Sequence, residues 1–145
     1  MSGSRRELFN KDRFLGYKDG LERNGIEFRE ELIAEGGNTK ADGLAKMRAL
    51  LSLSDRPDAV ICTDNIMSLG ILKAIQSAGL SVPQDVGIVS FDNFPVADLA
   101  DPPLTTVDVD VYELGVQTAH MLFKLIDNPL SRQQQTLIAT AIQPR

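Results

Sequence analysis

The spacing of apolar residues along the chain predicts alternating helices and strands. Apolar positions three and four residues apart indicate helices, and short apolar runs between turn residues indicate strands. The predicted helices cover residues 8–24, 39–51, 65–78 and 110–126. The predicted strands cover residues 32–34, 59–63, 86–91, 104–107 and 137–142. This order predicts an α/β fold. Its first helix has no preceding strand, as expected if the chain were cut from a larger protein.

The stretch from Pro57 to Asp92 forms the predicted centre of the fold, because two apolar strands flank one helix there. In such a βαβ unit, a right-handed crossover places the carboxyl ends of both strands at one edge of a parallel sheet. Asp64 and Asp92 follow those strand ends, at the edge where open α/β sheets bind small molecules. The two carboxylates would accept charge-assisted hydrogen bonds from a polyhydroxylated or amine-bearing ligand.

Each of these polar residues also has a purely structural interpretation. Asp64 could act only as the N-cap of the following helix, and Asp92 could serve only the turn after its strand. Arg13, in the first predicted helix, could be a solvated surface arginine.

Gly70, inside the helix between the two strands, predicts a close contact with another helix.

Composition places the chain among ordinary globular proteins of one domain or slightly more. It has 145 residues, of which 43% are hydrophobic and 24% charged, and its net charge is −5. No basic cluster exceeds the pair Arg5-Arg6, so the chain by itself is a poor nucleic-acid binder. The single cysteine, Cys62, excludes an internal disulfide and is expected to be a buried thiol.

Targeting signals are not evident in the sequence. No apolar run approaches the roughly 20 residues of a membrane helix, so we expect no membrane association. Residues 1–6, Met-Ser-Gly-Ser-Arg-Arg, lack the apolar stretch of a secretory signal and are interpreted as a leader or expression remnant. A cytoplasmic location is therefore expected.

Catalytic patterns are scarce, and we expect no enzyme activity, no metal ion and no cofactor. His120 is the only histidine and has no serine or cysteine partner in the pattern. Gly36-Gly37 lacks the spacing of a phosphate-binding loop. A Mg²⁺-dependent phosphoryl-handling site on Asp64 and Asp92 is a less favoured alternative, since it would need another acidic residue and a lysine nearby.

Several stretches together resemble a known family. The chain closely resembles the C-terminal part of the effector-binding region of LacI/GalR-type bacterial transcription regulators. The matching stretches are Arg13-Phe-Leu-Gly-Tyr17, Arg56-Pro-Asp-Ala-Val60 with Thr63-Asp-Asn65, Gly79-Leu-Ser-Val-Pro-Gln-Asp-Val86, Ser90-Phe-Asp-Asn93 and Pro102-Pro-Leu-Thr-Thr-Val107.

The resemblance implies a periplasmic-binding-protein-like fold of type I, a three-layer αβα arrangement around a parallel sheet. Residues 7–100 would form part of the C-terminal effector-binding subdomain. Residues 101–130 would cross into the N-terminal subdomain and contribute a helix to it, and residues 131–145 would form the return strand and a truncated tail. The helix-turn-helix headpiece and most of the N-terminal subdomain are absent, so we expect half a cleft with weak or no effector binding.

The resemblance also implies roles for individual residues. Arg13 and Asp92 would contact a sugar-like effector, and Asp64-Asn65 inverts the usual Asn-Asp order of the family. Asn38 stands where many relatives have an aromatic platform, and Phe9, with Glu7, lies where some relatives contact ligand.

The family further implies a homodimer that contacts operator DNA only through the absent headpiece. Missing strands would leave open edges and exposed apolar faces, so dimerisation or strand exchange is expected. The main alternative is a periplasmic sugar-binding protein of the same fold.

Overall fold

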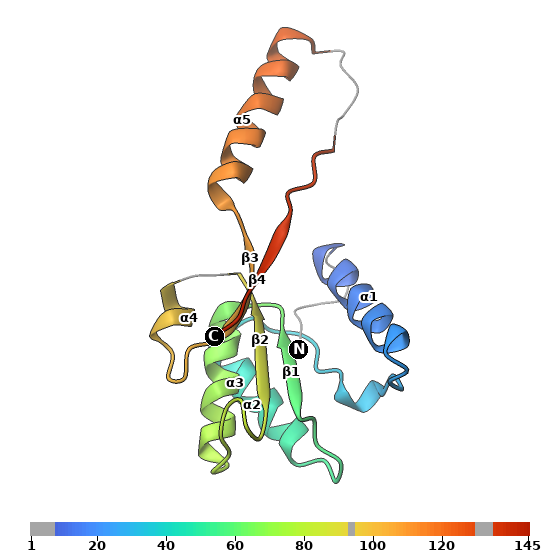
Figure 1. The fold of residues 1–145 in the computed structure, drawn as a ribbon, viewed down its shortest axis with the longest axis vertical. Helices are drawn as coiled ribbons and strands as arrows, with labels where there is room; N and C mark the ends of the chain where they lie inside the picture. Colours follow the sequence, from blue (N-terminus) through green and yellow to red (C-terminus); the bar gives the residue numbers. More distant parts are fainter. Residues whose placement is uncertain (1–7, 93–94, 130–134) are drawn as a thin grey trace.

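The structure is a computed structural model that describes residues 8–92, 95–129 and 135–145 (Figure 1). Its elements in chain order are α1 (Leu8–Arg23), the 3₁₀ helix η1 (Glu30–Leu32), α2 (Lys40–Leu51), β1 (Ala59–Cys62), α3 (Asn65–Ser77), β2 (Gly87–Phe91), α4 (Pro95–Leu99), β3 (Thr105–Val109), α5 (Val111–Asp127) and β4 (Thr140–Gln143).

The four strands form one mixed sheet in the order β1-β2-β3-β4. Strands β1, β2 and β3 run parallel, with Val60 opposite Ile88 and Ser90 opposite Thr106, and β4 pairs antiparallel to β3. The α/β fold and its central parallel βαβ unit are therefore confirmed. Helices α2 and α3 cover one face of the sheet, and α1 stands apart from them beyond β1 (Figure 1).

The hydrophobic core lies between the sheet and the helices α2 and α3. Alternate residues of β1 and β2 point into it, so Val60, Cys62 and Ile88 are buried while their neighbours are more exposed. Both helices contribute buried side chains to the core, namely Met47 and Leu50 from α2 and Met67, Ile71 and Ile75 from α3. The other sheet face is only partly covered, and Ile61 remains 41% exposed.

Two glycines let α2 and α3 pack unusually closely. A Cβ atom added at Gly70 would lie 2.0 Å from the carbonyl oxygen of Lys40, and one added at Gly43 would lie 2.2 Å from that of Met67. Both distances are far below van der Waals contact, so the two backbones touch where these residues lack side chains. The close helix contact predicted from Gly70 is confirmed.

Polar side chains cap the starts of three helices. Thr39 forms a capping box with Asp42, whose carboxylate accepts from both the Thr39 amide at 3.0 Å and the Thr39 hydroxyl. These hydrogen bonds, led by the one from the hydroxyl, lower the pKa of Asp42. Asp64 caps α3 and Asp110 caps α5, each by accepting an amide hydrogen bond at 2.9 Å.

Some sequence predictions were wrong. Residues 32–34, predicted as a strand, follow and overlap η1, and only Glu35 forms an isolated bridge. The helix α4 was not predicted, because it is short and begins at a proline. Strand β4 starts later than predicted, at Thr140. The proposed leader, residues 1–6, lies outside the described residues.

The helix α5 was predicted correctly, but its apolar face is not an inner face in this chain. No residue of α5 is buried, and Val111, Leu122 and Phe123 are more than half exposed. Figure 1 shows the reason: β3 and β4 carry α5 away from the rest of the molecule as a stalk. Among the described helices, none is both long and apolar enough to span a membrane.

The helix contact predicts opposite outcomes for two Gly→Ala substitutions. Gly70→Ala forces a methyl group against the backbone of Lys40 and should destabilise the chain by about 3 kcal/mol, the upper end for overpacking. Gly16→Ala, at an open position inside α1, should stabilise it by up to about 1 kcal/mol through helix propensity. Urea unfolding measures both, and equal effects would contradict the packing argument.

Candidate functional site

The carboxyl ends of β1 and β2 lie side by side. Cys62 and Ser90 are partners in the parallel register, so Asp64 and Asp92 each follow two residues beyond a paired position. Both aspartates are half-buried. The structure therefore brings the two residues to one edge of the sheet, as the βαβ pattern predicted.

Arg13 reaches this edge from α1. Its Nη1 donates a hydrogen bond of 2.9 Å to the carbonyl oxygen of Thr63, and its Cζ lies 4.2 Å from the centroid of the Phe91 ring. The side chain is half-buried, so the interpretation of Arg13 as a solvated surface arginine was wrong. A guanidinium has five N–H donors in a planar fork, which suits hydroxyl and carboxylate recognition.

The backbone at Asp92 is unusual. Its φ of 68° lies in the left-handed region, and its amide donates a 3.0 Å hydrogen bond to the carbonyl oxygen of Val107. Asp is one of the few residues other than glycine that tolerate this conformation, and such residues gather at functional sites. The turn interpretation of Asp92 is thus correct for the backbone, and it is compatible with a carboxylate that contacts ligand.

Asp64 is the N-cap of α3, because its Oδ1 accepts from the amide of Met67. Asn65 begins the helix, is only 9% exposed, and accepts from the Ser68 hydroxyl through its carbonyl oxygen. The capping role proposed for Asp64 is therefore confirmed. A carboxylate with one oxygen committed to the helix has less capacity left for a ligand than Asp92 has.

The other predicted site residues are not joined to this group. Asn38 is exposed and precedes the capping residue Thr39 at the start of α2. The backbone of Phe9 lies in the first turn of α1, but its side chain, like the whole of Glu7, lies outside what the structure describes. Sequence reasoning missed Thr63 and Phe91, although strand alternation already placed Phe91 on the face opposite Ser90.

A cavity of about 490 Å³ runs along the outer side of β1, between β1, α1 and residues 26–34. It meets the strand-end group only at Arg13 and Thr63, and apolar side chains such as Phe14 and Ile61 line much of the remainder. Burial raises the pKa of Tyr17, which also lines it. Because the polar groups that could orient a hydrophilic ligand gather at the strand ends, the candidate site is placed there.

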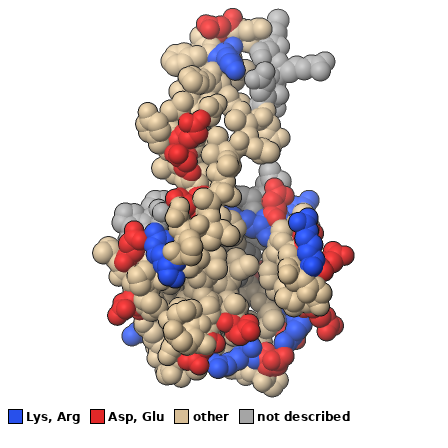
Figure 2. Space-filling view, in the orientation of Figure 1, with Lys and Arg blue, Asp and Glu red and all other residues tan. Residues whose placement is uncertain are grey.

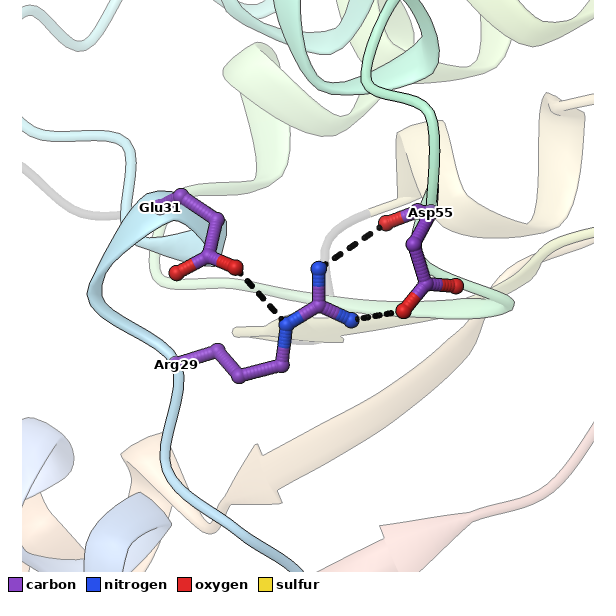
Figure 3. Close-up of polar contacts among 3 residues, drawn as sticks. All are labelled: Arg29, Glu31 and Asp55. Carbon is purple, nitrogen blue, oxygen red and sulfur yellow. Dashed lines mark hydrogen bonds and ion pairs between the residues drawn. The ribbon is translucent and has the colours of Figure 1, made fainter.

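Arg29 joins two walls of the cavity at its far end (Figure 3). Its Nε lies 2.9 Å from the Glu31 carboxylate, Nη1 pairs with the Asp55 carboxylate, and Nη2 donates to the Asp55 carbonyl oxygen at 3.2 Å. The hydrogen bond to Glu31 is the main cause that raises the pKa of Arg29. These exposed groups connect the segment after α1 to the loop before β1, and we assign them a structural role.

A buried amine lies behind the strand ends. Lys46 Nζ is shielded from solvent and has no hydrogen-bond partner among the described residues, and burial lowers the pKa of this lysine. Burial also raises the pKa of the nearby Cys62 thiol, which donates to the Asp64 carbonyl oxygen at 2.9 Å. Cys62 is therefore the inert buried thiol that the sequence predicted.

Comparison with known proteins identifies the family. Residues 2–145 match the family described as periplasmic binding protein-like domain. The chain belongs to this family. One relative is the HTH-type transcriptional repressor PurR of Mannheimia succiniciproducens, which is 36% identical over 116 residues, 80% of this chain and 35% of the relative. The chain spans about a third of the length of such relatives.

Solved structures agree with this placement in the periplasmic binding protein-like family. A complex of the transcriptional regulator CelR with cellobiose has a TM-score of 0.92 and 30% identity, over 100% of this chain and 44% of that one. A LacI family regulator from Lactobacillus casei with bound sucrose has a TM-score of 0.81 and 25% identity, over 94% of this chain and 50% of that one. The resemblance to the effector-binding region of LacI-type regulators is confirmed, since these relatives are transcription regulators.

The buried amine generates a pH-dependent prediction. Lys46→Met should stabilise the chain by up to about 1 kcal/mol at pH 7, because the cost of desolvating an amine without a hydrogen-bond partner exceeds the attraction that Asp42 provides. Since the folded pKa is lowered, the native state releases its proton before the unfolded chain does, and wild-type stability should rise as pH approaches 10.5. The advantage of Lys46→Met should therefore shrink over that alkaline range.

Thermal and urea unfolding between pH 7 and 10 would measure this difference. Lys73→Met, an exposed lysine of α3, is the matched control and should change stability by less than about 0.5 kcal/mol at every pH. A Lys46→Met variant that is less stable than the wild type at pH 7 would refute the argument that desolvation of Lys46 outweighs its attraction to Asp42.

Proposed function

We propose that this chain is the effector-binding and dimerisation part of a cytoplasmic LacI-type transcription regulator that senses a sugar or sugar derivative. The observation that carries the proposal is the group at the strand ends, where the Arg13 guanidinium lies beside the segments that bear Asp64 and Asp92. The guanidinium supplies hydrogen-bond donors and the two carboxylates supply acceptors. This combination suits a ligand rich in hydroxyl groups, because each hydroxyl can both donate and accept.

Bound sugars in two relatives support the ligand class. Cellobiose and sucrose are neutral and rich in hydroxyl groups, and they occupy proteins that share this fold. Arg13 and Asp92 are the primary contacts in our proposal. Asp64 is secondary because one of its oxygens caps α3, and Asn65 is secondary because it is buried. Asn38 and Phe9 remain candidate contacts through the resemblance alone.

The regulator is favoured over a periplasmic sugar-binding protein because the similar proteins are transcription regulators. Operator DNA would be bound by a helix-turn-helix outside this chain. In agreement, Figure 2 shows acidic and basic side chains interspersed on the drawn face, without a basic stripe. Effector binding would shift the arrangement of two subdomains, a coupling typically worth about 1–3 kcal/mol.

The position of α5, which β3 and β4 hold away from the rest of the molecule, supports the proposed subdomain boundary near residue 101. Residues 7–100 would belong to the C-terminal subdomain, 101–130 would enter the N-terminal subdomain, and 131–145 would return. Helix α5 carries apolar residues that nothing in the described chain covers, as a helix would if it packed in a second subdomain. This chain would then supply half a cleft.

Calorimetry on the longer regulator that contains this chain tests the effector proposal, with a panel of neutral mono- and disaccharides that includes cellobiose and sucrose. One panel member should bind with micromolar affinity. Asp92→Asn should weaken binding by about 10- to 100-fold, because it removes charge-assisted hydrogen bonds. Stability should hardly change, because Asn also tolerates a positive φ.

Asp19→Asn, which neutralises an exposed carboxylate of α1, is the control and should bind like the wild type. Binding of no panel member, or unchanged affinity in Asp92→Asn, would refute the proposed effector site. Micromolar affinity of the 145-residue chain alone would refute the half-cleft proposal.

We also propose that the exposed apolar face of α5 makes the 145-residue chain self-associate. Leu122→Lys places a charge on that face and should weaken association at least tenfold. His120→Lys adds a charge to the same helix at an exposed position off this face and should have little effect. Sedimentation velocity over a concentration series measures both, and a wild-type chain that stays monomeric throughout would contradict the proposal.

A further inference from the structure

Phe91 occupies a defined place at the edge of the candidate site. It is the last residue of β2, and strand alternation buries its neighbour Ser90 against the helices while directing Phe91 to the opposite face. That opposite face is the one approached by α1. Phe91 is only half-buried, so its ring is available to a side chain arriving from α1.

The parallel register places two different groups around one guanidinium. Cys62 pairs with Ser90, so the next residues, Thr63 and Phe91, lie at the same level of the sheet. The Thr63 carbonyl oxygen accepts from Arg13 Nη1 at 2.9 Å, and the Phe91 ring lies 4.2 Å from Arg13 Cζ. A hydrogen bond and a ring contact thus restrain the same cation from different directions.

We propose that Phe91 is a positioning residue, which holds the Arg13 guanidinium beside Asp92 before the effector arrives. Arginine has many rotamers, and fixing them on binding lowers affinity, whereas an arginine already held loses less. A cation above an aromatic face gains attraction that does not consume its in-plane N–H donors. The ring therefore orients Arg13 through the face of its guanidinium, whereas the hydrogen bond from Nη1 to Thr63 uses an in-plane donor.

The backbone adds to this arrangement. The left-handed conformation of Asp92 turns the chain immediately after Phe91, and the Asp92 amide is anchored to Val107. The ring and the carboxylate are therefore held by consecutive residues whose backbone is fixed by the sheet. A movement of β2 would carry both of them together relative to α1.

Arginine-selective NMR on the 145-residue chain tests the positioning role without any ligand. In the wild type, the ring current of Phe91 should move the Arg13 δ-methylene and Nε–H protons upfield of their ordinary positions. Phe91→Leu keeps an apolar residue but removes the ring, so it should abolish the shift. Phe91→Tyr retains an aromatic face and should restore it.

Phe28→Leu is the matched control. Phe28 is also half-buried and packs edge-on against Phe14 and Tyr17 of α1, at centroid distances of 6.0 and 6.5 Å. It should leave the Arg13 shift in place. Ordinary Arg13 shifts in the wild type, or a loss in Phe28→Leu as large as in Phe91→Leu, would overturn the proposal.

The consequence for affinity rests on the proposed function and is measured separately. In the longer regulator, Phe91→Leu should weaken binding of the sugar found in the panel by about two- to fivefold, and Phe91→Tyr should not. Unchanged affinity in Phe91→Leu would overturn the positioning role. If no sugar binds the wild type, the proposed function fails, and the NMR result alone decides whether Phe91 holds Arg13.

Discussion

The backbone contact between α2 and α3 is the constraint on which the rest of the structure depends. At Gly43 and Gly70 the two helices approach so closely that neither position has room for a Cβ atom. This contact fixes the spacing between α2 and α3, and so helps to hold the Asp64 cap at the start of α3 in place. A shift of the helix pair would move one carboxylate of the candidate site directly.

The two faces of the sheet are held by different kinds of interaction. Against α2 and α3 the sheet buries a continuous apolar core, including Met47, Met67 and Ile71. On the other face, Arg13 connects α1 to the strand ends, and Phe14 and Tyr17 of α1 pack on Phe28 in the segment that follows α1. Elements with few buried apolar contacts open at lower free energy than the core does. The side that carries the arginine is thus the more adaptable side of the site.

Most of the fold was predictable because its signals are local. The caps at Thr39, Asp64 and Asp110 and the close contact at Gly70 follow from short-range chemistry that the sequence displays. The failures have long-range causes. Whether residues 32–34 form a strand depends on a neighbouring strand, and whether the apolar face of α5 is buried depends on what packs against it. Neither partner is encoded in the local pattern.

The candidate site shows the same division. The sequence located Asp64 and Asp92 through the βαβ pattern, but periodicity alone favoured a solvated Arg13. The contact between Arg13 and Phe91 joins residues 78 positions apart, which no local pattern predicts. In the sequence pattern Phe91 is simply an apolar strand residue. Because side chains alternate between the two faces of a strand, and Ser90 is buried, Phe91 faces away from the core.

Asp64 and Asp92 contribute to the fold in different ways, the first through its side chain and the second through its backbone. Asp64 stabilises α3 through its side chain, so any substitution there changes helix stability and ligand chemistry together. Asp92 is held through its backbone, by the left-handed φ and the hydrogen bond from its amide to Val107, and its carboxylate makes no hydrogen bond with the described residues. The side chain at position 92 can change without loss of a hydrogen bond to the described residues, provided that the new residue tolerates a positive φ, as Asn does. In the proposed effector site, position 92 is thus restricted by its backbone conformation, whereas position 64 is restricted by the helix that its side chain caps.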